Sequence, residues 1–178
     1  MVNRLKRAAF IAVVGLLMAS PVLAQDKGDA AFVKKAIQGN LAEVQMGQLA
    51  QQKGASDNVR SFGQMLENDH AQNNQQATAL ARSMNVTPPS APNAEQKRTY
   101  DRLSKLSGAQ FDREFARSMV ADHKKDIREF QSEAKSKNSQ VANYANATLP
   151  DLQKHLQAAE GLSQTAQAPR GSAPSTLH

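Results

Sequence analysis

Three of the four histidines in this sequence stand beside or near acidic residues, in segments whose apolar residues recur with helical spacing. Carboxylates and imidazoles that project from facing helices into a bundle core are the ligands of di-metal sites in helical proteins. Such residues are therefore candidate ligands of a metal site, for which iron, manganese and zinc are the candidate ions. The candidate ligands lie in four different segments and are Glu43, Asp69, His70, His123, Asp126 and His155.

His123 is the candidate with the most informative surroundings. At about 100° per residue around a helix axis, it falls near the middle of an apolar arc. That arc is made of Phe115, Met119, Ile127 and Phe130. A polar ring in such a place needs a partner, because an unsatisfied buried polar group costs about 1–3 kcal/mol. We therefore expect acids and imidazoles from other helices to meet His123 inside the protein.

The spacing of the candidates departs from the di-iron pattern, in which two helices each supply Glu-x-x-His and two others each supply a Glu. Glu67 and His70 have this spacing, but Glu67 points partly away from the apolar stripe. Asp151 and His155 are one residue too far apart and offer the shorter acid. The third helix offers His123 in place of a Glu. The pattern alone does not decide between a metal site and a core of hydrogen-bonded histidines.

Two interpretations therefore stay open. In the first, the protein binds a metal in its core and acts in stress handling. In the second, it is a non-catalytic structural or interaction protein, whose core histidines are hydrogen-bonded to Asp69, Glu43 or Asp126 and specify the register of the helices. Serine nucleophile arrangements, phosphate-binding loops and dinucleotide motifs are absent, so no catalytic residue and no organic cofactor are predicted.

Four long segments with helical periodicity must position the candidates, at about 32–53, 58–84, 111–135 and 139–161. Short connections at 54–57 and 137–139 make antiparallel hairpins of the first and the last pair. A proline-rich stretch over 85–93 separates the hairpins, and a short helix at about 94–104 follows it. The prediction is an all-α, ferritin-like four-helix bundle of two antiparallel helical hairpins joined by a Pro-rich crossover with a short extra helix.

Distances from the turns place the candidates at similar depths. Glu43 is about as far before the first turn as residues 67–70 are after it. His123 is about as far before the second turn as Asp151 is after it, and His155 lies one helical turn deeper. Each hairpin thus carries its candidates near mid-helix, and hairpins packed along their length would bring them together.

The two ends of the chain differ in character from its middle. Arg4, Lys6 and Arg7, an apolar run over 8–18 and small residues before Gln25 are typical of a secretory signal peptide. We predict a signal peptide over 1–24, the helical bundle over 25–162, and a disordered tail rich in Gln, Ala, Pro and Ser over 163–178. The mature protein is then expected to be periplasmic or secreted.

Composition excludes several classes of protein. Cysteine is absent, which excludes disulfides, thiolate metal sites, a cysteine nucleophile and a lipid anchor on cysteine. The formal net charge of +6 falls by three when the three basic residues of the signal peptide leave, and it is interspersed with acids. No nucleic-acid partner is therefore predicted. After cleavage no run approaches the about 20 apolar residues of a membrane span. Protein partners and the oligomeric state are not indicated.

Several motifs, taken together, resemble those of a known family. They are Phe32-Val33, Ala42-Glu43 with Gly47-Gln48-Leu49-Ala50, Met65 with Asp69-His70, residues 105–112, Met119-Val120 with Asp122-His123, and Thr148-Leu149-Pro150 with His155-Leu156. Over nearly all of residues 32–161 the chain resembles the bacterial exported family called domain of unknown function 4142, often labelled an outer membrane protein. The resemblance implies an exported, ferritin-like helical bundle with no assigned biochemistry.

Overall fold

The computed structural model describes residues 21–167 of the chain, and its side chains over residues 27–165. This part folds into five helices: α1 (Pro21–Lys53), α2 (Asp57–Ser83), α3 (Ala94–Ser104), α4 (Gly108–Glu133) and α5 (Ser139–Gln167). The described residues form no strand. None of the five helices combines the length and the apolar character that crossing a membrane requires.

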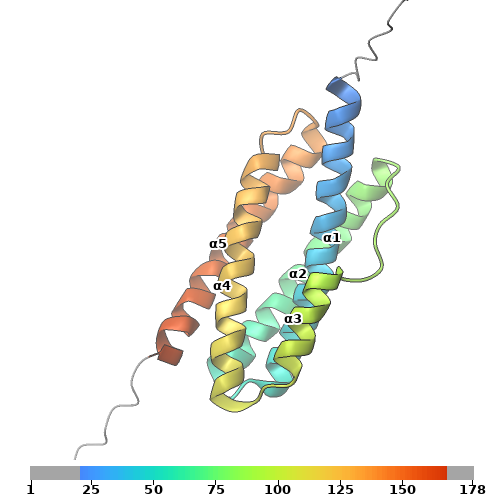
Figure 1. The fold of residues 1–178 in the computed structure, drawn as a ribbon. Coiled ribbons are helices and arrows are strands. Elements are labelled where there is room, and N and C mark those ends of the chain that lie inside the picture. Colours follow the sequence, from blue (N-terminus) through green and yellow to red (C-terminus); the bar gives the residue numbers. More distant parts are fainter. Residues whose placement is uncertain (1–20, 168–178) are drawn as a thin grey trace, which may run out of the picture.

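The four long helices form two antiparallel hairpins that pack against each other (Figure 1). α1 packs along α2 and α4 packs along α5, and the hairpins meet where α2 faces α5 and α1 faces α4. The connection after α2 returns along the bundle, so that α4 begins at the end where α1 turns into α2. α3 belongs to this connection and lies against α1 and α4. The predicted all-α bundle, with its crossover and short extra helix, is confirmed.

Local sequence signals explain where the helices begin. Ser56 caps α2, and its side chain accepts a hydrogen bond from the backbone N–H of Val59. Asn93 caps α3 and forms a capping box with Gln96, in which each side chain accepts from the backbone of the other residue. α4 begins at Gly108, whose φ of 59° is a conformation that favours glycine. These signals hold the crossover and its short helix in place beside α1.

Two glycines let α1 and α2 approach at backbone distance. A Cβ atom added at Gly47 would lie 2.5 Å from the carbonyl oxygen of Gly63, and one added at Gly63 would lie 2.6 Å from that of Gly47. No side chain fits in this space, so only glycine permits the contact. The close approach draws the middle of α2, which carries His70, toward α1.

The apolar core is divided into two clusters, one toward each end of the bundle. The first contains Met46, Leu49, Phe62, Leu66, Phe111, Phe115, Met119 and Ala159, and the second contains Phe32, Val33, Ile37, Ala77, Phe130, Val141, Tyr144 and Leu152. On each long helix, buried polar residues lie in sequence between the two clusters. They are Asn40 and Glu43 on α1, His70 on α2, His123 on α4 and His155 on α5.

The ends of the structure differ from the boundaries predicted from sequence. α5 continues through Pro150 and past the predicted end near residue 161 to Gln167, so residues 163–167 are helical. Hydrogen bonds from the Thr165 hydroxyl to the carbonyls of Gly161 and Leu162 belong to this extension. α1 already begins at Pro21, and the predicted cleavage after Ala24 falls within it. The rest of the predicted signal peptide, residues 1–20, and of the predicted tail, residues 168–178, lies outside the described residues.

Candidate metal centre

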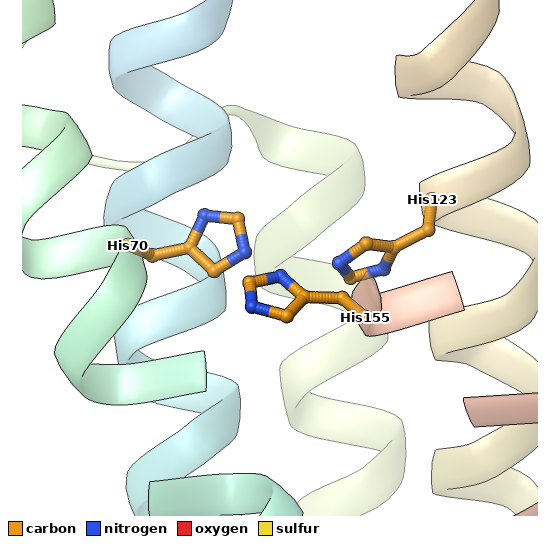
Figure 2. Close-up of side chains that lie close together, drawn as sticks. All are labelled: His70, His123 and His155. Carbon is orange, nitrogen blue, oxygen red and sulfur yellow. The ribbon is translucent and has the colours of Figure 1, made fainter. Parts of the chain in front are cut away.

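Three histidines from three helices meet in the middle of the bundle. Figure 2 shows the rings of His70 from α2, His123 from α4 and His155 from α5 turned toward a common centre. Their ring centroids are 5.2–5.8 Å apart. One potential ligand nitrogen of each ring lies within 4.8 Å of those of the other two, and all three side chains are buried. The convergence expected from helix depth is therefore present for these three residues.

The outer nitrogen of each ring has an oxygen as its hydrogen-bond partner. His123 Nδ1 lies 2.9 Å from the carbonyl oxygen of Met119, and His155 Nε2 lies 2.9 Å from Oδ2 of Asp69. His70 Nδ1 lies 2.9 Å from Oδ1 of Asn40. A carbonyl, a carboxylate and an amide oxygen only accept hydrogen bonds, so each of these ring nitrogens is assigned as the one that carries the hydrogen. The assignment places a lone pair on the opposite nitrogen of every ring.

The inner nitrogens have no hydrogen-bond partner within the described residues. These atoms are Nε2 of His70, Nε2 of His123 and Nδ1 of His155, and all of them are buried. A buried acceptor left without a partner costs about 1–3 kcal/mol. Three such acceptors at one place are a large cost for a small core, and three inward lone pairs with outward N–H groups held by oxygen form the usual environment of a metal-binding histidine cluster.

Burial and mutual repulsion lower the pKa of two of these imidazoles, those of His70 and His123. Burial, and then the nearby rings of His123 and His155, lower the pKa of His70 well below its usual value. Burial, and then His155, lower the pKa of His123 to about 4. The cause is that an imidazolium in this place would lose its hydration and face other imidazoles. At neutral pH both rings are therefore in the form that can bind a metal ion.

A chain of polar side chains supports the outer nitrogen of His70. Asn40, which accepts from that ring, donates through Nδ2 to Oδ1 of Asn73 at 2.8 Å. Asn73 donates in turn to the hydroxyl of Thr148, and Tyr144 donates its hydroxyl hydrogen to Asn73. Sequence reasoning did not assign Asn40 or Asn73 to the site. The sequence could have indicated Asn73, because it lies on the apolar stripe of α2 one turn after His70, where a buried amide needs polar partners.

Asp69 takes part by orienting a histidine, since its carboxylate holds Nε2 of His155. It also lies 3.6 Å from Nζ of Lys154. Glu67, the acid of the Glu-x-x-His spacing, instead accepts hydrogen bonds from Gln48 and Gln51 of α1 at the surface. These bonds lower the pKa of Glu67. The sequence-based placement of Glu67 away from the core agrees with this position.

Within the described residues, Glu43 and Asp126 form no hydrogen bond with the three histidines, whereas the structural interpretation expected such pairs. Both line a small cavity together with Asp122, and Asp126 also lines the larger adjoining cavity that His70 borders. The physical reason lies in α1, where residues 40 and 43 differ by about 60° around the helix axis. Asn40 therefore meets His70, while Glu43 faces α4 and α3. Glu43 is buried, and its Oε2 has no hydrogen-bond partner among the described residues.

Burial strongly affects these two acids. It raises the pKa of Glu43 well above its usual value, and the nearby Asp122 and Asp126 raise it further. Burial, then Asp122 and Glu129, raise the pKa of Asp126 to about 7. The bundle thus holds two distinct polar groups, a cluster of imidazoles and a cluster of acids whose charges repel one another.

Comparisons with known proteins agree with the fold. A crystal structure of a DUF305 fragment from Deinococcus radiodurans is similar with a TM-score of 0.68 and 16% sequence identity, over 77% of this chain and 95% of that one. At this identity the likeness concerns the fold alone. No curated protein is significantly similar to this chain. Residues 17–162 match the family described as "Domain of unknown function (DUF4142)". Because the match covers most of the chain, this protein belongs to that family.

Proposed function

We propose that this protein binds a transition-metal ion through His70, His123 and His155. The observation that carries the proposal is the set of three inner nitrogens, which are buried and lack hydrogen-bond partners, on rings that each bring one potential ligand nitrogen within 4.8 Å of the other two. A divalent cation would accept all three lone pairs at once and remove the cost of burying them. In this proposal Asp69, Asn40 and the Met119 carbonyl orient the rings.

The donor set selects among metals. Three neutral imidazoles suit zinc, copper, nickel or iron, whereas manganese prefers oxygen ligands. Among the ions expected from sequence, zinc therefore fits best. Nitrogens about 2.0–2.1 Å from a tetrahedral zinc would lie about 3.3 Å apart, so the rings would close by about 1.5 Å at most. Three protein ligands leave the fourth position open, as in metal sites that bind a water or a substrate.

The alternative, a purely structural hydrogen-bond network, has one observation in its favour, which is that every outer nitrogen is paired. A network that serves only to specify register is favoured when all its members are satisfied. The three inner nitrogens depart from that condition. The metal-binding interpretation accounts for them, and the structural one does not.

Metal-dependent stability tests the proposal. We expect Zn²⁺ at a hundredfold excess over its Kd to stabilise EDTA-treated, untagged protein by about 2.7 kcal/mol in chemical denaturation. The gain should vanish in His70→Ala and in His123→Ala, which remove ligands. Glu43→Gln serves as a control that removes a buried acid but no imidazole, and it should keep the gain. If wild type shows no gain with zinc, copper, nickel, cobalt or iron, the protein does not bind metal at this site.

The cell compartment is a separate proposal, supported by the amino-acid sequence alone. We propose export by cleavage after Ala24, because the basic start, the apolar run and the small residues before Gln25 have the order of a signal peptide. The intact mass of the protein recovered from periplasmic extract or medium should equal that of a chain whose first residue is Gln25. A full-length mass in both fractions would contradict export by this route.

A further inference from the structure

A cavity leads from the surface to the histidine cluster. It has a volume of about 230 Å³ and lies where α1, α4 and the start of α3 come together. His70 and Asn40 form part of its wall, while Lys35 and Glu129 belong to the same wall and reach solvent. Neither His123 nor His155 borders it. An ion that entered here would therefore meet His70 first.

The walls of this cavity carry an excess of acids. Asp126, Glu129 and Glu95 line it, against the two lysines Lys35 and Lys125. Lys35 is already paired with Glu129 across α1 and α4 at 2.9 Å. Burial raises the pKa of Asp126 to about 7, so this acid is only partly ionised at neutral pH, and an arriving cation displaces its proton and offsets the repulsion from neighbouring acids.

A second cavity of about 50 Å³ extends the acidic wall. It shares Gly39, Asn93, Glu95, Gln96, Lys125 and Asp126 with the first cavity, and it adds Glu43 and Asp122. Glu43 is 6% exposed, and its Oε2 lacks a hydrogen-bond partner among the described residues. This oxygen can coordinate a cation that enters the cavity, and the cation also reduces the repulsion between the neighbouring acids. Carboxylates bind divalent cations that keep part of their water shell, which suits ions in transit.

We propose that the two adjoining cavities are the route by which the metal ion reaches the histidines, and that Glu43 and Asp126 are its transient ligands on the way. This inference rests on the proposed metal binding by His70, His123 and His155. The oxygen ligands receive a hydrated divalent cation and pass it to His70, which lies at the inner end. Because His70 Nε2 is itself covered, the last step requires a local movement of side chains.

Gly39 offers a way to block the route without removing a charge. It lines both cavities, and a Cβ atom added there would meet only Nε2 of Gln96, at 4.0 Å. A larger side chain at this position therefore fits the backbone and fills the space in front of His70. Gly161 is the matched control, since it is also helical, has nothing within 4 Å of an added Cβ, and lines neither cavity.

The test measures the rate of Co²⁺ uptake by stopped flow, followed by the visible absorption of nitrogen-bound Co²⁺. In Glu43→Gln/Asp126→Asn we expect the association rate constant to fall about tenfold, with the final spectrum unchanged. Asp151→Asn, an exposed acid of α5 that lines neither cavity, should stay within about twofold, because a single surface charge is screened by salt. Gly39→Phe should slow uptake by a similar factor, and Gly161→Phe should not.

The outcomes separate the route from the site. If wild type develops no Co²⁺ spectrum, the proposed metal site fails and the route fails with it. If wild type binds Co²⁺ but the double variant and Gly39→Phe take it up at the wild-type rate, the site stands and the route is wrong. A changed final spectrum in the double variant would also overturn the route, because the acids would then be ligands of the bound ion.

Discussion

Asp112 and the histidine cluster are two buried polar regions of the same bundle, and they are satisfied in opposite ways. Asp112, near the start of α4, accepts from the backbone N–H of Ala55 at 2.8 Å and from that of Ser56 at 3.0 Å. Its two oxygens thus tie α4 to the turn between α1 and α2. In the cluster the outer nitrogens are paired in the same manner, but the three inner nitrogens are not.

This difference distinguishes a polar region that stabilises the fold from one that is available to bind a ligand. A buried carboxylate whose partners all belong to the chain contributes to the folded state whether or not a ligand is present. Buried nitrogens without partners destabilise the chain until something binds them. We therefore expect substitutions of Asp112 to change stability and leave metal binding intact, and substitutions around the histidines to change metal and proton binding.

The largest expected effect is on the pH dependence of the metal-free protein. His123 has a pKa of about 4 in the folded state and about 6.5 in an unfolded chain, so the unfolded state binds its proton first as the pH falls. The stability associated with neutral His123 is complete above about pH 6.5 and is lost as the pH falls toward 4. Across this window wild type should lose about 3 kcal/mol relative to His123→Gln.

Urea denaturation of both proteins in EDTA, at half-unit pH steps, measures this difference. His70 also has a lowered pKa and acts in the same direction, and because the ring of His123 contributes to that lowering, the difference between the two curves measures His123 together with its coupling to His70. Parallel curves for wild type and variant between pH 6.5 and 4 would mean that the ring of His123 is not held neutral by its surroundings.

Asp112→Ala should have the next largest effect. It removes two charge-assisted hydrogen bonds, and the exposed turn N–H groups can recover water, so we expect a loss of about 2 kcal/mol in the free energy of unfolding. The gain in stability on adding Zn²⁺ should equal that of wild type. A smaller gain in the variant would show that the two regions are coupled, and the contrast between them would then fail.

Asp69→Asn tests a residue that belongs to the histidine cluster but, like Asp112, acts by accepting a hydrogen bond. The amide keeps the shape of the side chain but loses the charge that accepts from His155 Nε2. We expect a loss of at least about tenfold in Zn²⁺ affinity, the usual effect of removing a carboxylate behind a metal-binding histidine. Competition with a chromophoric chelator measures the affinity. An unchanged affinity would mean that His155 does not depend on Asp69 for its orientation.

Glu67→Gln should have the smallest effect and is the matched control for Asp69→Asn. Glu67 lies two residues before Asp69 on α2, but its partners Gln48 and Gln51 are at the surface. The same chelator competition should give the wild-type Zn²⁺ affinity. A loss comparable to that of Asp69→Asn would reinstate Glu-x-x-His as the ligand pattern, with Glu67 turning inward in the metal-bound protein.

Much of the fold could be predicted from the sequence, because helix period and turn residues are local properties. The spacing of Phe62 and Leu66, or of Phe115 and Met119, identifies the buried face of a helix, and the prolines of the crossover identify where no helix passes. A rise of 1.5 Å per residue then places His70, His123 and His155 near mid-helix, within about one helical turn of the same depth. Their convergence follows from local geometry once the hairpins pack along their length.

Tertiary structure alone decided which nitrogen of each histidine faces inward and which acids stay apart from them. Asn40 and Glu43 are neighbours on α1, yet a rotation of about 60° sends one to His70 and the other toward Asp122 and Asp126 of α4. That angle belongs to any α-helix, but the direction in which each residue then points depends on how α1 packs against its neighbours, and at Gly47 and Gly63 it packs on α2 at backbone distance. Sequence periodicity determines which face of a helix is buried, but only the packed helices determine which partner a buried side chain meets.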